Sequence, residues 1–325
     1  MSTLPVATPL SRRRMLRLGA AVTGGMMAAN TFATRIASAQ GSSGDDTTPS
    51  KAAQQMIEQI IQAKGKASNG VFSISIERKD IPNVHLHGVP MTPAFIIHGG
   101  LDFQSAGGGG DEVVMNADMC LKAHELNPFI HQLIANNITF QAQHQHMYDF
   151  DPLVWFVHFR AQGDPNAIAT GVKAALKVTS TPFPQTPPAN PLTPLPAQQI
   201  GQILGAKPSV QAHGVVVYKL PRREQMMLGG TNINPYLNVE THAHFMPYGG
   251  GHNAAVIPDF GMIASEVNKV IGQQQKNGWD IGCLYNQETD EKPQLYWSHN
   301  FKTGDALQLA QELREAMNLM NLKFM

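Results

Sequence analysis

The segment Leu153-Val154-Trp155-Phe156-Val157-His158 has a counterpart 141 residues later, Gln294-Leu295-Tyr296-Trp297-Ser298-His299. Both segments place two aromatic residues ahead of a histidine at the same spacing. Further pairs return at offsets of 141 to 144 residues: Ala53-Gln54-Gln55 with Ala197-Gln198-Gln199, Glu125-Leu126-Asn127 with Glu266-Val267-Asn268, and Gly163-Asp164 with Gly304-Asp305. An offset this steady along the chain predicts an internal duplication.

The duplication divides the chain into parts. We predict a first α+β repeat at residues 51–178 and a second at residues 197–325. Residues 179–196 between them contain seven prolines, which predicts a semi-rigid, extended linker. Residues 40–50 are rich in Gly, Ser, Asp and Thr, and this composition predicts a flexible tail ahead of the first repeat.

Each repeat shows the same order of predicted elements. An opening helix and an alternating strand come first, then a second strand, a short apolar strand, a helix, a β-hairpin and a closing helix. The dipeptide Asp164-Pro165 marks the start of the closing helix, because Asp is a favoured N-cap and Pro a favoured first helical residue. The β-α-β-β-α order predicts a ferredoxin-like unit. The predicted fold class is therefore α+β, a tandem duplication of this unit with antiparallel or mixed sheets.

Some boundaries are predicted directly from the residue pattern. The opening helices are expected at 53–63 and 197–204, the alternating strand at 71–76, the second strands at 94–103 and 236–245, and the hairpin strands at about 138–147 and 153–160.

The N-terminal residues have the three parts of a twin-arginine export signal. Arg12-Arg13-Arg14 is followed by a weakly apolar run from Leu18 to Ala33 and by the small-residue cleavage pattern Ala37-Ser38-Ala39. We therefore predict a signal peptide at residues 1–39, passage through the twin-arginine machinery, and a mature protein that is periplasmic or secreted.

Composition excludes several classes of function. Lys+Arg and Asp+Glu are both 24 in a chain of 325 residues, so no basic surplus is available for nucleic acid. Two cysteines cannot form a four-thiolate zinc site, and whether Cys120 and Cys283 pair stays open. We expect no membrane span in the mature chain, because no stretch of it reaches about 20 clean apolar residues.

The motifs together resemble the LppY/LpqO-type bacterial secreted proteins, a family of unknown function built from two such copies. The segments that carry the resemblance are Gly70–Ser75, Gly88-Val89-Pro90, Glu125–Pro128, the hairpin from Ile138 to Phe159, and Gly163-Asp164-Pro165. The family hairpin usually carries a His-Asn-His triplet, and His144-Gln145-His146 stands in its place. The second copy departs from this pattern with Tyr285-Asn286-Gln287, so the resemblance implies that only the first copy carries the triplet.

Histidine spacing predicts a first metal site. His144 and His146 are two residues apart on a predicted strand, so both side chains lie on one face. His158 lies on the partner strand of the hairpin and reaches the same face if the register makes it a cross-strand neighbour of His144. Three converging imidazoles are typical of open zinc or copper sites. His299 is the counterpart of His158 without those partners, and a structural role is equally compatible with its position.

A second candidate set is Glu240, His242 and His244, which alternate on one strand face. One carboxylate and two imidazoles suit iron, zinc or manganese. We hypothesise an exported protein that binds a transition metal (copper, zinc, iron or manganese) through these clusters, with a metal-dependent enzymatic role as an extension of that hypothesis. The alternative is a metal-free module that binds a small ligand or a protein in the cleft between the repeats, with solvated histidines.

Overall fold

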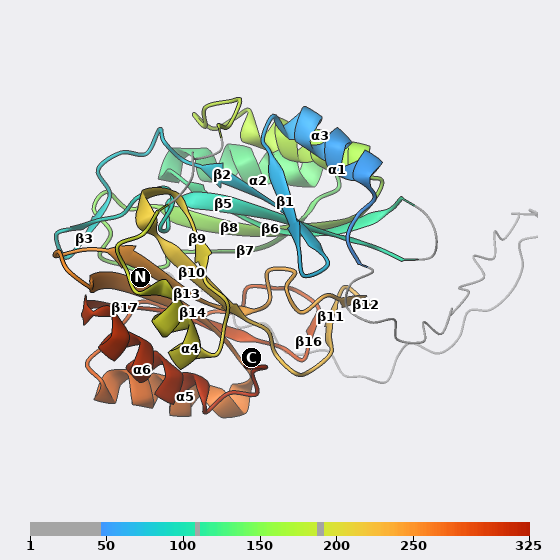
Figure 1. Cartoon of the computed structure of the whole chain (residues 1–325). Coiled ribbons are helices and arrows are strands. Elements are labelled where there is room, and N and C mark those ends of the chain that lie inside the picture. The colour runs from blue at the N-terminus through green and yellow to red at the C-terminus, as the bar shows by residue number, and fades with distance from the viewer. Residues whose placement is uncertain (1–46, 108–110, 187–191) are drawn as a thin grey trace, which may run out of the picture. The chain divides into compact units, whose positions relative to one another are not determined.

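The computed structural model of the protein describes residues 47–107, 111–186 and 192–325 (Figure 1). The predicted export signal at residues 1–39 and residues 40–46 of the predicted tail lie outside the described residues. Within the described part, no helix is both long and apolar enough to cross a membrane.

The first repeat folds into one six-stranded antiparallel sheet with three helices. The strand order is β1-β2-β5-β6-β8-β7. The elements are α1 (Lys51–Ile61), β1 (Gly65–Ser68), β2 (Val71–Glu77), β3 (His85–Leu86), β4 (Val89–Pro90), β5 (His98–Ser105), β6 (Val113–Leu121), the 3-10 helix η1 (Ala123–Glu125), α2 (Leu126–Ala135), β7 (Thr139–His144), β8 (Trp155–Gly163) and α3 (Pro165–Leu176).

The second repeat has the same plan. Its main sheet runs β15-β17-β14-β13-β10-β9, and β12-β11-β16 form a small additional sheet. The elements are α4 (Ala197–Leu204), β9 (Ser209–Val210), the 3-10 helix η2 (Ala212–Gly214), β10 (Val216–Leu220), β11 (Met226–Leu228), β12 (Thr231–Ile233), β13 (Thr241–Pro247), β14 (Asn253–Met262), α5 (Ala264–Lys276), β15 (Asp280–Ile281), β16 (Glu291–Lys292), β17 (Tyr296–Asp305) and α6 (Ala306–Met317).

The predicted α+β duplication is confirmed. In the first repeat, β6, α2 and β7 form a split β-α-β unit, because the antiparallel strand β8 lies between β6 and β7. In the second repeat β14, α5, β15 and β17 take the corresponding places. The ladders described are all antiparallel.

The closing helices begin as the sequence predicts. Asp164 caps α3 by accepting a hydrogen bond from the Ala167 backbone N–H, and Pro165 is the first helical residue. Asp305 caps α6 in the same way through the backbone N–H groups of Leu307 and Gln308.

The predicted second strands begin too early. Residues 94–97 form a turn, in which the backbone N–H groups of Phe95, Ile96 and Ile97 point to the carbonyl of Thr92, and β5 starts only at His98. β13 likewise starts at Thr241 rather than at residue 236. An apolar run such as 94–97 cannot be told from a buried strand by periodicity alone.

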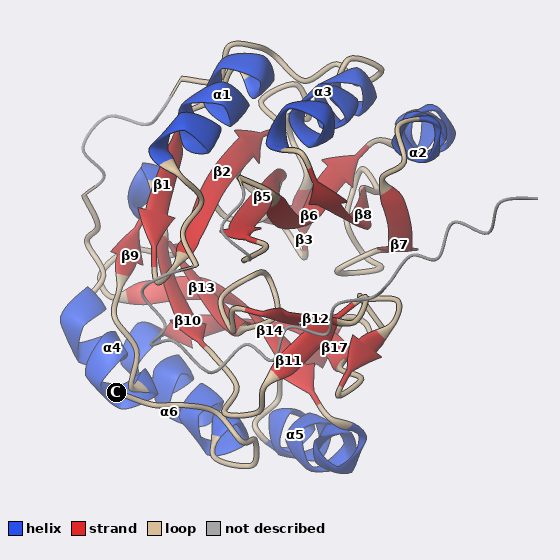
Figure 2. Ribbon diagram, turned by 90° about the vertical axis from the view of Figure 1, so that its right-hand side faces the viewer, coloured by secondary structure: helices blue, strands red, loops and turns tan. Residues whose placement is uncertain are grey.

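The two main sheets lie face to face, with helices on the outer faces (Figure 2). α1, α2 and α3 cover the outer face of the first sheet, and α4, α5 and α6 cover that of the second. A third apolar cluster joins the inner faces, with members from both repeats such as Phe156 and Cys120 from the first and Val217 and Ile257 from the second. The inner faces therefore belong to a shared interior.

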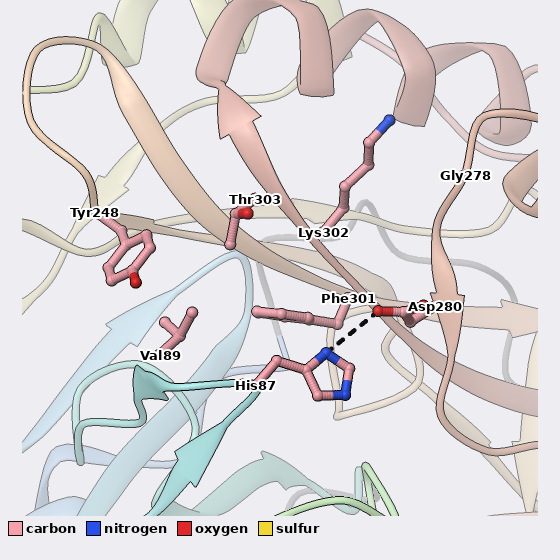
Figure 3. A pocket seen from close by; sticks show the side chains of 8 residues that line it. All are labelled: His87, Val89, Tyr248, Gly278, Asp280, Phe301, Lys302 and Thr303. Carbon is pink, nitrogen blue, oxygen red and sulfur yellow. Dashed lines mark ion pairs between the residues drawn. The ribbon is translucent and has the colours of Figure 1, made fainter.

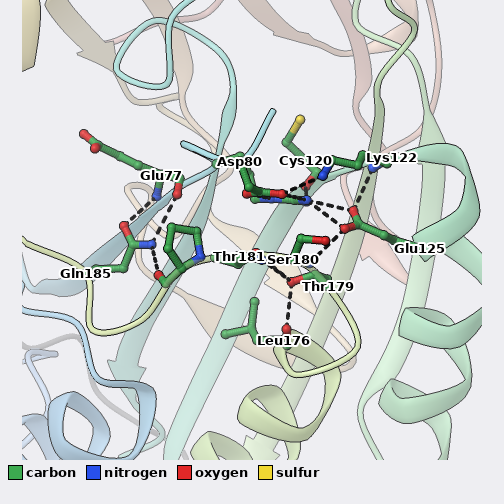
Figure 4. A network of polar contacts seen from close by, with 12 residues as sticks. Glu77, Asp80, Cys120, Lys122, Glu125, Leu176, Thr179, Ser180, Thr181 and Gln185 are labelled. Carbon is green, nitrogen blue, oxygen red and sulfur yellow. Dashed lines mark hydrogen bonds and ion pairs between the residues drawn. The ribbon is translucent and has the colours of Figure 1, made fainter. Parts of the chain in front are cut away.

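Each repeat contains a fully buried arginine that holds its helix to its sheet. The Arg78 guanidinium donates to Asp80, to the Cys120 carbonyl and, at 2.8–2.9 Å, to both carboxylate oxygens of Glu125. Figure 4 shows Asp80, Cys120 and Glu125 gathered in this network. In the second repeat Arg222 makes the same contacts with Glu224, the Gly261 carbonyl and Glu266. The glutamate at each site also accepts a backbone hydrogen bond at the start of a helix, from Lys122 N or Ile263 N. The pairing of each glutamate with a buried arginine explains why both Glu125-Leu126-Asn127 and its counterpart Glu266-Val267-Asn268 begin with glutamate.

We expect the Arg78→Met variant to lose about 3–5 kcal/mol of unfolding free energy, because it leaves the Glu125 carboxylate buried without its cation. Urea denaturation measures this loss. The control is Lys64→Met, which removes an exposed ion pair with Glu58 and should cost less than about 1 kcal/mol. Equal stabilities of the two variants would contradict this account.

Candidate metal centre

The histidines of the first predicted cluster lie on the inner face of the first sheet. His144 ends β7, and His158 lies on the neighbouring strand β8. The register pairs His144 with Phe156 and His158 with Ala142, so the two histidines are diagonal rather than directly opposite neighbours. Residues two apart on a strand share a face, and the Nε2 atoms of His144 and His158 accordingly lie 2.9 Å apart.

His146 joins this pair from the loop after β7. Its ring lies 4.9 Å from that of His144, centroid to centroid. One ligand atom from each of His144, His146 and His158 lies within 4.8 Å of the others. The three side chains are 9%, 6% and 3% exposed. The hairpin therefore brings together the three residues of the first predicted cluster.

Burial keeps these imidazoles neutral. Desolvation lowers the pKa of His158 to about 3, and it lowers the pKa values of His144 and His146 well below their ordinary value, with neighbouring imidazoles adding to the effect. A neutral imidazole has a free lone pair, which is the form that binds a metal ion.

Several ring nitrogens of the cluster have no hydrogen-bond partner. The Nδ1 atoms of His144, His146 and His158 are all buried and unpaired. An unpaired polar atom in the interior costs free energy, so each such atom calls for an explanation. A bound ion at the centre would supply partners for imidazole nitrogens that the protein itself leaves without one.

The second repeat contributes residues that the sequence analysis missed. His299 on β17 stacks on His146, with ring centroids 3.7 Å apart, and its Nδ1 lies 3.2 Å from the Cys283 sulfur. One ligand atom each from His144, Cys283 and His299 lies within 4.8 Å of the others. Cys120 and Cys283 are both free thiols, so the open question of a disulfide between them is answered.

Two acidic residues flank the centre at equivalent places in the duplication. Asp118 faces His158 across the ladder of β6 and β8, and Asp259 faces His299 across that of β14 and β17. Asp259 lies 3.3 Å from His299 Nε2. Burial alone would lower the pKa of His299, but the charges of Asp259 and Cys283 outweigh it and raise that pKa to about 10. The 141-residue offset relates His158 to His299 and Asp118 to Asp259, and it is the sequence signal that could have indicated this pairing.

The residues of the second predicted cluster contact other groups of the protein. The Glu240 carboxylate is 2.6 Å from Lys219 Nζ and 3.0 Å from His242 Nε2. Burial alone would raise the pKa of Glu240, but Lys219 and His242 lower it well below its ordinary value. His244 Nδ1 lies 3.0 Å from the Phe95 carbonyl. Within the described residues, Glu240, His242 and His244 do not form a group with ligand atoms inside 4.8 Å of one another.

Comparison with known families agrees with the duplicated fold. The profile of a domain of unknown function matches residues 55–178 and again residues 198–319. The chain belongs to the DUF1259 family. Both copies of the DUF1259 domain contribute to the centre, the first through His144, His146 and His158 and the second through Cys283 and His299. No curated protein and no solved structure matches the chain.

The neutral histidines predict how the metal-free protein responds to acid. The folded-state pKa of His158, about 3, lies below its ordinary value of 6.5, so the unfolded chain binds the proton more readily. The stability linked to His158 is therefore complete above pH 6.5 and is lost as the pH falls from there toward 3. Wild type should lose unfolding free energy between about pH 7.5 and about pH 5. We expect His158→Gln to lose about 2 kcal/mol less over the same range.

Urea denaturation at the two pH values, after treatment with a chelator, measures this difference. His131→Gln on the exposed side of α2 is the control and should keep the wild-type pH dependence. An unchanged pH dependence in His158→Gln would contradict the buried neutral state of His158.

Proposed function

We propose that this protein is exported and binds one transition-metal ion beside His144, where the buried imidazoles of His146 and His158 converge. The observation that carries the proposal is the convergence of three buried imidazoles, each with an unpaired Nδ1 atom. Copper and zinc are metals typical of sites built from three converging imidazoles. The residues of the second predicted cluster are a weaker candidate, since Glu240 and His244 already have protein partners.

Export is the second part of the proposal. Its support is the order of basic, apolar and small residues at positions 1–39, which is typical of a twin-arginine signal. The mature protein would then act in the periplasm or outside the cell. The resemblance to the LppY/LpqO-type secreted proteins agrees with this location and with the two-copy organisation.

A metal-dependent reaction is an extension of the same proposal. An ion bound here would supply a Lewis acid or a redox centre. The protein's own residues would orient the ligands and exclude water, since the histidines are buried between two sheets. Asp259 would hold the His299 ring in place through the Nε2 atom of that ring.

A metal-free binding module is the second candidate, and a cavity between the repeats favours it. The cavity of about 260 Å³ is lined by residues of both repeats: His87, Val89, Tyr248, Gly278, Asp280, Phe301, Lys302 and Thr303 (Figure 3). His87 from the first repeat lies 3.4 Å from Asp280 of the second. A small polar ligand with an aromatic or apolar part fits this lining.

Elemental analysis of the mature protein, purified from its own export route without a nickel column, separates the two candidates. We expect close to one equivalent of metal in wild type and its loss in the double variant His144→Ala/His146→Ala, because two of the three imidazoles are gone. The matched control His242→Ala/His244→Ala should keep its metal.

If wild type is purified without metal and binds no metal on titration, this result would contradict the proposal and favour the binding module. Unchanged metal content in both double variants would contradict metal binding by either cluster.

A further inference from the structure

Two possible ligand sets share His144. One is confined to the first repeat and consists of His144, His146 and His158. The other crosses between the repeats and consists of His144, Cys283 and His299. An ion beside His144 can therefore be held by three imidazoles or by two imidazoles and a sulfur atom, and these two sets select different metals.

The contact between Asp259 and His299 favours the set that crosses between the repeats. A metal-binding histidine normally uses one ring nitrogen for the metal while its other nitrogen contacts a carboxylate or carbonyl. His299 has this arrangement, because Asp259 lies 3.3 Å from its Nε2 while its Nδ1 faces the Cys283 sulfur at 3.2 Å. The Nδ1 atoms of His146 and His158 have no such partner. His299 is thus the histidine of the centre that is already oriented as a ligand.

Main-chain packing fixes the sulfur beside the histidines. A side chain at Gly282 would overlap the carbonyl of His146 and the sulfur of Met147, so the absence of a Cβ lets the loop after β7 press against the segment that carries Cys283. The Tyr285 ring, two residues beyond Cys283, stacks on His144 with centroids 3.6 Å apart. Cys283 is partly accessible, whereas Cys120 is fully buried.

We propose that His144, His299 and Cys283 hold the ion, and that the ion is copper or zinc rather than manganese. The inference rests on the proposed function, because it requires that a metal ion binds at this centre at all. A thiolate is a soft ligand that suits copper and zinc, whereas manganese prefers oxygen ligands. The Cys283 thiol and the His299 ring, which Asp259 keeps protonated, each lose one proton to solvent when their bonds to the metal form. The bound ion then links the two copies of the domain.

Titration of the metal-free mature protein with cobalt(II) tests this ligand set, because a cobalt–thiolate bond gives an intense near-ultraviolet charge-transfer absorption. We expect that absorption in wild type and in His158→Ala. Cys283→Ser should lose it and bind cobalt about tenfold or more weakly. Cys120→Ser is the matched control and should behave as wild type. Zinc should displace the cobalt, and manganese at the same concentration should not.

The outcomes separate the inference from the proposed function. Cobalt binding with an identical spectrum and affinity in Cys283→Ser would overturn the ligand set proposed here while leaving the histidine site intact. Displacement of cobalt by manganese as readily as by zinc would overturn the choice of metals. Wild type that binds no cobalt, zinc or copper would contradict the proposed function itself. A second variant, Cys283→Ala, and circular dichroism of both variants show whether the fold is retained.

Discussion

The packing of the two sheets against each other is the constraint on which the rest of the structure depends. Each sheet buries one face under its own helices, and its other face must be covered by the sheet of the other copy. Part of the shared interior is apolar, and part of it is polar. Burying polar side chains costs free energy unless they find partners, and the structure pairs several across the repeats, such as Asn116 with Glu288 at 2.7 Å.

The histidine centre differs from those satisfied contacts. Glu240 has Lys219, and Arg78 has Glu125, so these buried charges are compensated within the protein. The Nδ1 atoms of His144, His146 and His158 lack any partner. A region in which the fold brings several neutral imidazoles together and leaves their Nδ1 atoms unpaired is a natural place for a metal ion, and this contrast is the physical basis of the proposed function.

Much of the fold follows from the sequence, because the duplication can be recognised without a structure. The 141-residue offset assigned the order of elements in each copy, and Asp164-Pro165 located the start of α3. The two-residue spacing of His144 and His146 and the hairpin that carries His158 also indicated the first cluster. These are local signals, since strand periodicity and turn chemistry act over a few residues.

The rest depended on which faces pack together, and no local pattern carries that information. Cys283 and His299 join the centre only because the second sheet faces the first. The two-residue spacing of a metal-binding pattern also occurs in Glu240, His242 and His244. In the structure, however, Glu240 pairs with Lys219, and His244 lies beside the Phe95 carbonyl. The turn at residues 94–97 is apolar because its side chains pack in the interior between the sheets. In sequence, such an apolar run resembles a buried strand.

Anomalous diffraction from crystals of the mature, natively exported protein, measured at the absorption edges of copper and zinc, would locate the ion. We predict one anomalous peak beside His144, between the first sheet and the segment of the second repeat that carries Cys283. The absence of any peak there in metal-replete crystals, or a peak at Glu240 and His242 instead, would contradict it.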